Sequence, residues 1–257
     1  MSSSMQGKIS SVSQEAEWAT RCDLAALYRL MAHFRWTDHI DTHISARVPG
    51  TTNRYLINKF GVMFHEMRAS DLVEVDHAGE AVSHLSVGEK VNQAGFNIHS
   101  AIHGAMPEAE YVIHTHSPAG MAVSAQEAGL LPVTQHAMKF YNRLGYHDYE
   151  GISWDTSERD RLTGSLGKHR AMIMRNHGLL ATGRTAAEAF NLIYFLERAC
   201  QAQIMAMSGG AKLRQPSEDI CELVAVQEEQ EWVNGTHLLA WDAALRLIDN
   251  SVCDYRS

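Results

Sequence analysis

Apolar residues recur every three or four positions in several stretches of the chain, which is the spacing of one helix face. Trp18, Cys22 and Ala25 begin the first of these stretches. The segments 155–158 and 185–188 have the Ser/Thr/Asp-x-x-Glu arrangement of a capping box and predict two more helix starts. Helices are therefore expected over about 15–36, 91–105 and 119–128, from 155 onward, and over 185–207.

Short runs rich in β-branched and aromatic residues alternate with these helices. The clearest is 110–116, Glu-Tyr-Val-Ile-His-Thr-His, which ends before Pro118 and has the composition of a buried strand. Strands are expected over 43–48, 54–57, 72–75, 110–116, 131–134, 171–175 and 179–182. This alternation predicts an α/β fold in which helices flank one central sheet.

Composition narrows the class of protein. The chain has 257 residues, of which 45% are apolar and 20% charged, as in an ordinary globular protein. No run of 18 apolar residues is present, so no membrane-spanning helix is expected. The formal charge is −8 and no segment concentrates Lys and Arg, which disfavours nucleic acid as a partner.

Residue usage at the ends and among the cysteines suggests location and domain organisation. Residues 1–14 are polar and Ser-rich, without the charged and apolar regions of a secretion signal, and are expected to form a flexible tail. The four cysteines form no Cys-x-x-Cys pair and suit a reducing cytoplasm. One domain is expected over 15–210, followed by an acidic helical extension over 211–257.

Histidine is unusually frequent, with 15 residues, and its arrangement suggests a metal site. In a strand, His114 and His116 point to the same face, so their imidazoles can chelate one divalent ion. His177, in a tight turn between two apolar strands, is the candidate third ligand, leaving one position for a substrate. Surface or satisfied core histidines are the alternative. Apolar neighbours imply burial, however, and adjacent buried imidazoles without a metal are costly.

Three other histidines are candidates for catalysis. His99 and His103 lie four residues apart on one helix face. A pair with this spacing can bind metal, but no Glu follows His99, so the metalloprotease pattern His-Glu-x-x-His is absent. We expect the pair to orient metal ligands or carry protons, and a structural role on the helix face is the alternative. His136 is a candidate acid or base near neutral pH.

Four segments together resemble the class II aldolase/adducin family: 42–45 (Thr-His-Ile-Ser), 98–103, 113–116 and 176–180. The resemblance covers roughly residues 20–210 and implies a three-layer α/β/α sandwich with a largely antiparallel or mixed sheet. It also implies a homotetramer with active sites at subunit interfaces. Under it, His114, His116 and His177 are the ligands of a divalent metal, usually zinc, while manganese, iron and cobalt also suit imidazoles.

The chain departs from the family's pattern at the catalytic positions. Gly95 stands where fuculose-phosphate aldolase-like members carry a catalytic Glu and ribulose-phosphate epimerase-like members an Asp. His43 stands where those aldolases have a phosphate-binding Asn, and His136 stands in place of their tyrosine acid. We therefore expect a substrate other than a sugar phosphate. His43 and Lys59 are the candidate substrate-binding residues, although a solvated surface lysine is the alternative for Lys59.

These features predict a metal-dependent lyase that acts on a small oxygenated or carboxylated compound. A metal ion that polarises a carbonyl group favours both retro-aldol cleavage and decarboxylation. Decarboxylation requires no base to begin, so it suits a site without the Glu. The alternative is a noncatalytic, adducin-like binding or scaffold module that has kept the fold.

Overall fold

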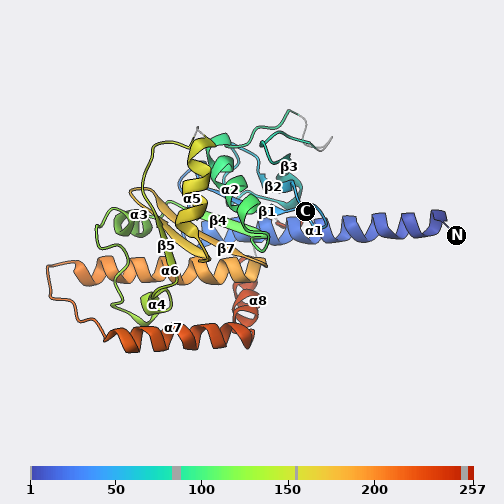
Figure 1. The fold of residues 1–257 in the computed structure, drawn as a ribbon. Coiled ribbons are helices and arrows are strands. Elements are labelled where there is room, and N and C mark those ends of the chain that lie inside the picture. Colours follow the sequence, from blue (N-terminus) through green and yellow to red (C-terminus); the bar gives the residue numbers. More distant parts are fainter. Residues whose placement is uncertain (1, 83–87, 154–155, 250–253) are drawn as a thin grey trace.

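A computed structural model describes the backbone of residues 2–82, 88–153, 156–249 and 254–257, with side chains from residue 13 onward. Seven strands form one mixed sheet in the order β3-β2-β1-β4-β7-β6-β5 (Figure 1). Every neighbouring pair is antiparallel except β5 and β6. The strands are β1 His43–Arg47, β2 Arg54–Asn58, β3 Leu72–Asp76, β4 Tyr111–Thr115, β5 Leu144–His147, β6 Ala171–Met174 and β7 Gly178–Gly183.

Helices cover both faces of this sheet, so the fold is the expected three-layer α/β/α sandwich (Figure 1). The helices are α1 Ser2–His33, α2 Gln93–Ala105, α3 Pro118–Ser124, α4 Gln135–Met138, α5 Arg159–Leu166, α6 Ala186–Met207, α7 Glu218–Val233 and α8 Thr236–Ile248. Two 3-10 turns, η1 Ala69–Asp71 and η2 Thr156–Glu158, precede β3 and α5.

The alternation of side chains along β4 divides the core into two layers. Ile113 packs with residues of α1, α6 and α8 on one face of the sheet. Val112 packs with residues of α2 and α5 on the other face. Because both faces are covered, the five residues of β4 are all buried, and the candidate metal ligand His114 lies inside the protein.

One sequence prediction needs correction. Residues 131–134 form no strand; Pro132 cannot donate a ladder hydrogen bond, and the Thr134 hydroxyl accepts from the backbone N–H of Ala137 to cap α4. Residues 2–14 continue α1, because an existing helix extends without a new nucleus, and their expected flexibility remains a prediction. The domain limits at 15 and 210 remain predictions.

The expected capping boxes had different outcomes. Asp155 lies outside the described residues, so the first is not described. The hydroxyl of Thr185 accepts from the backbone N–H of Glu188, which confirms α6 as a capped helix. The Glu188 carboxylate accepts from the N–H of Arg184 rather than that of Thr185, so only half of the box forms.

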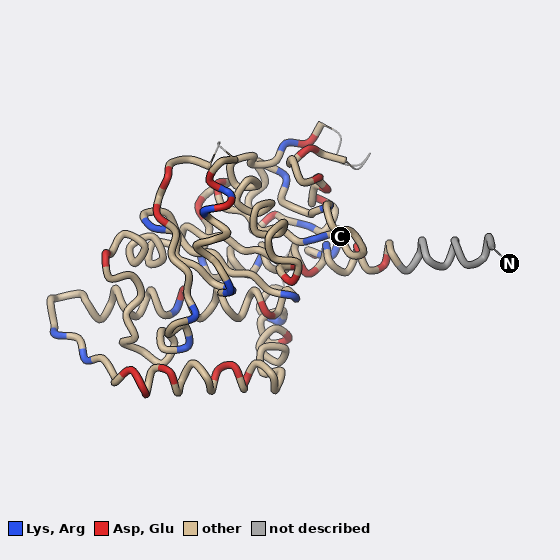
Figure 2. Tube along the Cα trace, in the orientation of Figure 1, with Lys and Arg blue, Asp and Glu red and all other residues tan. Residues whose placement is uncertain are grey.

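The segment 211–257 folds back onto the sandwich. Helix α8 buries Trp241, Ala244 and Ile248 in the same core as α6 and α1. Helix α7 carries most of the acidic side chains of this segment (Figure 2). None of the described helices combines the length and the apolar character needed to cross a membrane.

Candidate metal centre

Strand β4 and the turn between β6 and β7 bring three histidines together. Leu179 of β7 pairs with Thr115 of β4, so the turn that carries His177 lies beside the end of β4. Asn176 enters this turn with φ +56°, a conformation that Asn tolerates. A Cβ atom on Gly178 would lie 2.2 Å from the carbonyl oxygen of Thr115, so only glycine lets the turn approach this closely.

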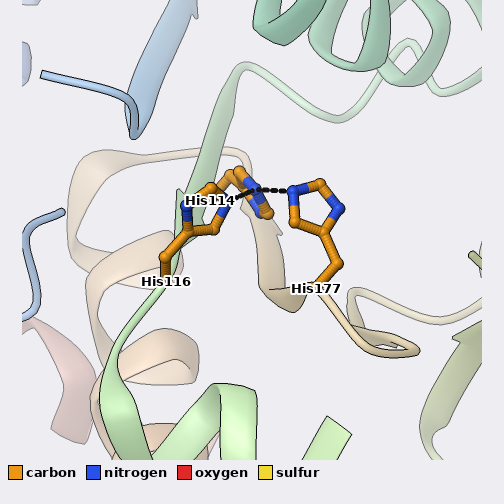
Figure 3. Close-up of side chains that lie close together, drawn as sticks. All are labelled: His114, His116 and His177. Atoms are coloured by element: carbon orange, nitrogen blue, oxygen red, sulfur yellow. Dashed lines mark hydrogen bonds between the residues drawn. The ribbon is translucent and has the colours of Figure 1, made fainter. Parts of the chain in front are cut away.

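The three imidazoles point toward one another (Figure 3). Nε2 of His114 lies 2.8 Å from Nε2 of His116 and 3.3 Å from Nε2 of His177. The three ligand atoms all lie within 4.8 Å of one another. His114 is fully buried and the other two are partly exposed, so the group is accessible from one side. The structure thus brings together the three residues that the sequence singled out.

Hydrogen bonds fix the tautomers of two of these rings. Nδ1 of His114 donates to the carbonyl oxygen of Leu179, at 2.9 Å. Nδ1 of His116 donates to Oδ2 of Asp38, at 3.1 Å. In the neutral rings both Nε2 atoms therefore present lone pairs, which cannot hydrogen-bond to each other. A cation bound by these lone pairs removes the conflict, so the donor set fits a divalent metal.

Burial keeps two of the candidate ligands, His114 and His177, neutral. Burial and then the neighbouring imidazoles of His116 and His177 hold the pKa of His114 well below its usual value. Burial and then His116 lower the pKa of His177 to about 4. Neutral imidazole is the form that binds metal, so these rings need no deprotonation at pH 7.

A second group of histidines lies next to the first, on β1 and α2. His43 of β1 pairs with His114 of β4, and their ring centroids are 5.1 Å apart. Nδ1 of His43 lies 2.7 Å from Nε2 of His99. Ser45 Oγ joins Nδ1 of His99, at 2.6 Å, to Nε2 of His103, at 2.8 Å. We refer to His43, His99, Ser45 and His103 as the imidazole chain.

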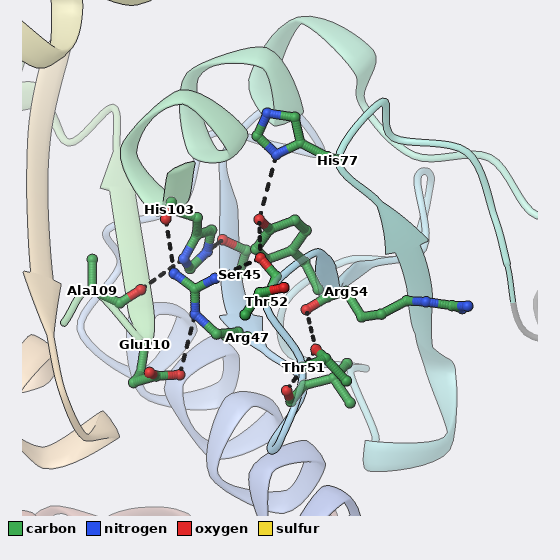
Figure 4. Close-up of polar contacts among 11 residues, drawn as sticks. Ser45, Arg47, Thr51, Thr52, Arg54, His77, His103, Ala109 and Glu110 are labelled. Carbon is green, nitrogen blue, oxygen red and sulfur yellow. Dashed lines mark hydrogen bonds and ion pairs between the residues drawn. The ribbon is translucent and has the colours of Figure 1, made fainter. Parts of the chain in front are cut away.

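The far end of the imidazole chain is anchored to backbone (Figure 4). Nδ1 of His103 donates to the carbonyl oxygen of Ala109, at 2.7 Å. The guanidinium of Arg47 donates to the carbonyl oxygen of His103, at 2.8 Å, and forms an ion pair with Glu110. Burial lowers the pKa of His103 to about 3, and the pKa values of His43 and His99 also lie well below their usual range because both rings are buried.

The structure does not join the other two predicted site residues to this group. His136 lies on α4, where its ring packs against Phe195 of α6. Lys59 follows β2 and forms an exposed ion pair with Glu89, at 2.8 Å. Their proposed roles in catalysis and substrate binding remain predictions.

Sequence analysis missed two features near the metal candidates. Asp38 lies in a loop before β1, and no spacing rule connects it with His116. His147, at the end of β5, is buried and hydrogen-bonded to Glu158, at 3.0 Å. Together with His177, both residues line a gap too narrow to hold a water molecule. A larger cavity of about 680 Å³ lies between α4, α7 and β6, and none of the metal candidates lines it.

Known proteins share both the sequence and the fold. An aldolase II superfamily protein from Pseudomonas syringae is 47% identical, with a TM-score of 0.88 over 94% of this chain and 96% of that one. The L-fuculose 1-phosphate aldolase of Glaciozyma antarctica is 28% identical, with a TM-score of 0.75 over 84% and 83% of the two chains. Rat alpha-adducin is 37% identical over 96% of this chain, which spans 35% of that protein.

Residues 22–204 match the family described as the Class II Aldolase and Adducin N-terminal domain. This segment contains all seven strands, the three converging histidines and the imidazole chain. The match covers more than half of the chain, and the relatives above agree with it. The chain therefore belongs to the class II aldolase/adducin family.

Proposed function

We propose that this chain is a metal-dependent carbon–carbon lyase acting on a small oxygenated, carboxylated substrate. The observation that supports this proposal is the convergence of three buried or partly buried imidazoles, two of which are held by hydrogen bonds with their Nε2 lone pairs facing each other. His114, His116 and His177 would hold the ion, with zinc the expected metal. A bound divalent ion would supply a Lewis acid that polarises a carbonyl group and stabilises the negative charge developing as a carbon–carbon bond breaks.

The protein's own residues shape the chemistry around that ion. The carboxylate of Asp38 holds His116 in the ligating tautomer. Gly95 supplies no carboxylate, and the imidazole chain beside His114 is neutral at pH 7. The side of the site formed by Gly95 and the imidazole chain thus carries no negative charge that would repel an anionic substrate at the metal, which suits both retro-aldol cleavage of a hydroxy keto acid and decarboxylation.

A noncatalytic binding module is the second candidate. The specific observation in its favour is Gly95, which offers no side chain where family aldolases carry their catalytic Glu. Under this alternative the fold persists without turnover. The homology with rat alpha-adducin is compatible with it but does not distinguish it from the enzyme.

One experiment separates the two candidates. Metal-reconstituted protein is incubated with hydroxy keto acids and sugar acids, and release of pyruvate, aldehyde or CO2 is measured with and without chelator. The lyase predicts chelator-sensitive turnover in the wild type and in His65→Ala, an exposed histidine outside both clusters, and none in His114→Ala. Stoichiometric metal without turnover on any substrate favours the binding module, and a folded wild type that binds no metal contradicts the lyase.

The remaining features of the proposal are an oligomer and a location. We propose a homotetramer with active sites at subunit interfaces, acting on a small molecule in the cytoplasm. Light scattering of the purified protein gives the mass directly. A monomeric mass for the metal-loaded protein would contradict the interfacial site.

A further inference from the structure

The imidazole chain has a single consistent direction of hydrogen-bond donation. A carbonyl oxygen only accepts, so Nδ1 of His103 carries the proton shared with Ala109. Nε2 of this neutral ring is then an acceptor, and Ser45 must donate its only hydroxyl proton to it. The chain therefore starts from a fixed backbone group rather than from a group that can change its protonation.

The direction of donation at the His103 end fixes the direction of each hydrogen bond up to His43. Because Ser45 has given its proton to His103, its oxygen accepts from Nδ1 of His99. Nε2 of His99 then accepts from Nδ1 of His43. Nε2 of His43 is left with a lone pair that makes no hydrogen bond among the residues that the structure describes. This atom is not one of the fully buried unpaired polar atoms, so solvent reaches it.

Helix α2 leaves room for this ring only because position 95 is glycine. A Cβ atom on Gly95 would lie 2.1 Å from both Nε2 and Cδ2 of His43. The His43 ring therefore occupies the space into which any side chain at position 95 would project. The hydrogen-bonding group at this place comes from β1 rather than α2, and it is neutral rather than a carboxylate.

We propose that Nε2 of His43 accepts a hydrogen bond from a hydroxyl group of the substrate, which assigns the substrate to the hydroxy acids. This inference rests on the proposed function, because the metal would hold the substrate beside His114, the cross-strand neighbour of His43. His43 is the specificity-determining residue. His99, Ser45 and His103 are positioning residues that keep the lone pair of His43 directed at the substrate.

A neutral acceptor selects this class for an electrostatic reason. A carboxylate at this place would also accept from a hydroxyl, but it would repel the carboxylate of a hydroxy acid bound to the same metal. Imidazole accepts the hydroxyl without that repulsion. An analogue that displaces solvent from Nε2 of His43 but lacks the hydroxyl leaves this acceptor unpaired, which penalises its binding.

Binding of two probes tests the assignment. Calorimetry with zinc-loaded protein compares L-lactate with propionate, which differ only in the hydroxyl group. We expect the step from wild type to His43→Phe to weaken lactate binding by about 10-fold, the scale of one lost hydrogen bond, while propionate changes by less than about 2-fold. Lactate affinity unchanged by the substitution, an equal loss for both probes, or zinc-loaded wild type that binds neither would overturn the assignment.

A spectroscopic measurement keeps the inference testable if His43→Phe does not fold. Imidazole nitrogen-15 shifts of the zinc-loaded wild type should show His43 protonated at Nδ1 and bare at Nε2, and lactate but not propionate should shift the Nε2 signal. His99→Phe should mix the two tautomers of His43 while zinc stays bound. A proton on Nε2 of His43 in the wild type would refute the proposed direction, whereas wild type that binds no zinc refutes the proposed function instead.

Discussion

Two groups of imidazoles meet where strands β1 and β4 pair, and they differ in whether their hydrogen-bond donors and acceptors match. In the imidazole chain every internal donor meets an acceptor, from Ala109 through Ser45 to His43. In the group of His114, His116 and His177, the hydrogen bonds to Leu179 and Asp38 use up the donors and leave acceptors facing acceptors.

This difference is the one expected between a structural histidine cluster and a group of histidines that could hold a metal. Both groups are close-packed, and burial lowers the pKa of members of both. Proximity and pKa therefore do not distinguish them. The balance of donors and acceptors does, because only in the second group do the acceptor nitrogens of two rings face each other with no proton between them.

The largest effect is expected from Gly178→Ala. The added Cβ would lie 2.2 Å from the carbonyl oxygen of Thr115, and neither backbone can move without breaking the β4–β7 ladder. We expect a loss of at least about 3 kcal/mol in the free energy of unfolding, as for other severe backbone clashes, together with loss of bound metal. Urea unfolding and elemental analysis measure the two effects.

Gly164→Ala is the matched control for that substitution. Gly164 lies in α5, and a Cβ there meets no atom within 4 Å. Alanine should therefore stabilise the helix by up to about 1 kcal/mol. If the two variants behaved alike, the close approach of the His177 turn to β4 would be wrong.

Asp38→Ala tests the acceptor that orients His116. Without the carboxylate, the ring is free to turn and to exchange tautomers, so we expect zinc affinity to fall by about 10- to 100-fold. Competition with a fluorescent chelator measures this change. Asp41→Ala removes an equal charge from a nearby exposed position and should leave the zinc affinity within about 2-fold. If Asp38 acted only by attracting the cation, the two variants would lose similar affinity.

Acid should destabilise the metal-free protein partly through the imidazole chain. Burial lowers the pKa of His103 from the 6.5 of an exposed histidine in the unfolded chain to about 3 in the folded protein. Between these two pH values the unfolded state therefore binds one more proton. Stability from this group is therefore lost as the pH falls below about 6.5, by up to about 1.4 kcal/mol per pH unit. Urea unfolding at pH 7, 6 and 5 should show a smaller loss for His103→Gln than for wild type; equal slopes would mean that His103 is protonated in the fold.

The smallest effect is expected from His136→Phe, which alters a histidine that belongs to neither group. Its Nδ1 is buried without a partner among the described residues, and its ring already packs against Phe195. Phenylalanine should change the free energy of unfolding by less than about 1 kcal/mol and leave the metal content unchanged. Loss of metal in this variant would show that the site extends to α4.

Local patterns in the sequence predicted the three converging histidines, because two share a strand and the third lies in a turn between strands. Strands β1, β2, β3, β4, β6 and β7 were also predictable from composition. The chemistry of the imidazole chain was not, since it depends on strand order: β1 pairs with β4 although 63 residues separate Arg47 from Tyr111. Asp38 was missed for the same reason, as only the folded loop brings it to His116.

Gly95 and His43, the two positions at which the chain differs from the family's pattern of a Glu and an Asn, cannot be interpreted separately. In the sequence, Gly95 appears as a lost carboxylate and His43 as a lost amide. In the structure they are a single exchange, in which the ring of one fills the space released by the other. Only the distance between α2 and β1 makes this visible.

The facing lone pairs of His114 and His116 have a practical consequence for biochemistry. Freshly expressed protein should scavenge whichever divalent ion is abundant in the growth medium or on the purification resin, since imidazole ligands discriminate poorly among zinc, nickel, cobalt and copper. The element found after purification would thus report supply. Reconstituting the stripped protein with each ion in turn and comparing turnover of the proposed lyase would identify the ion that serves it.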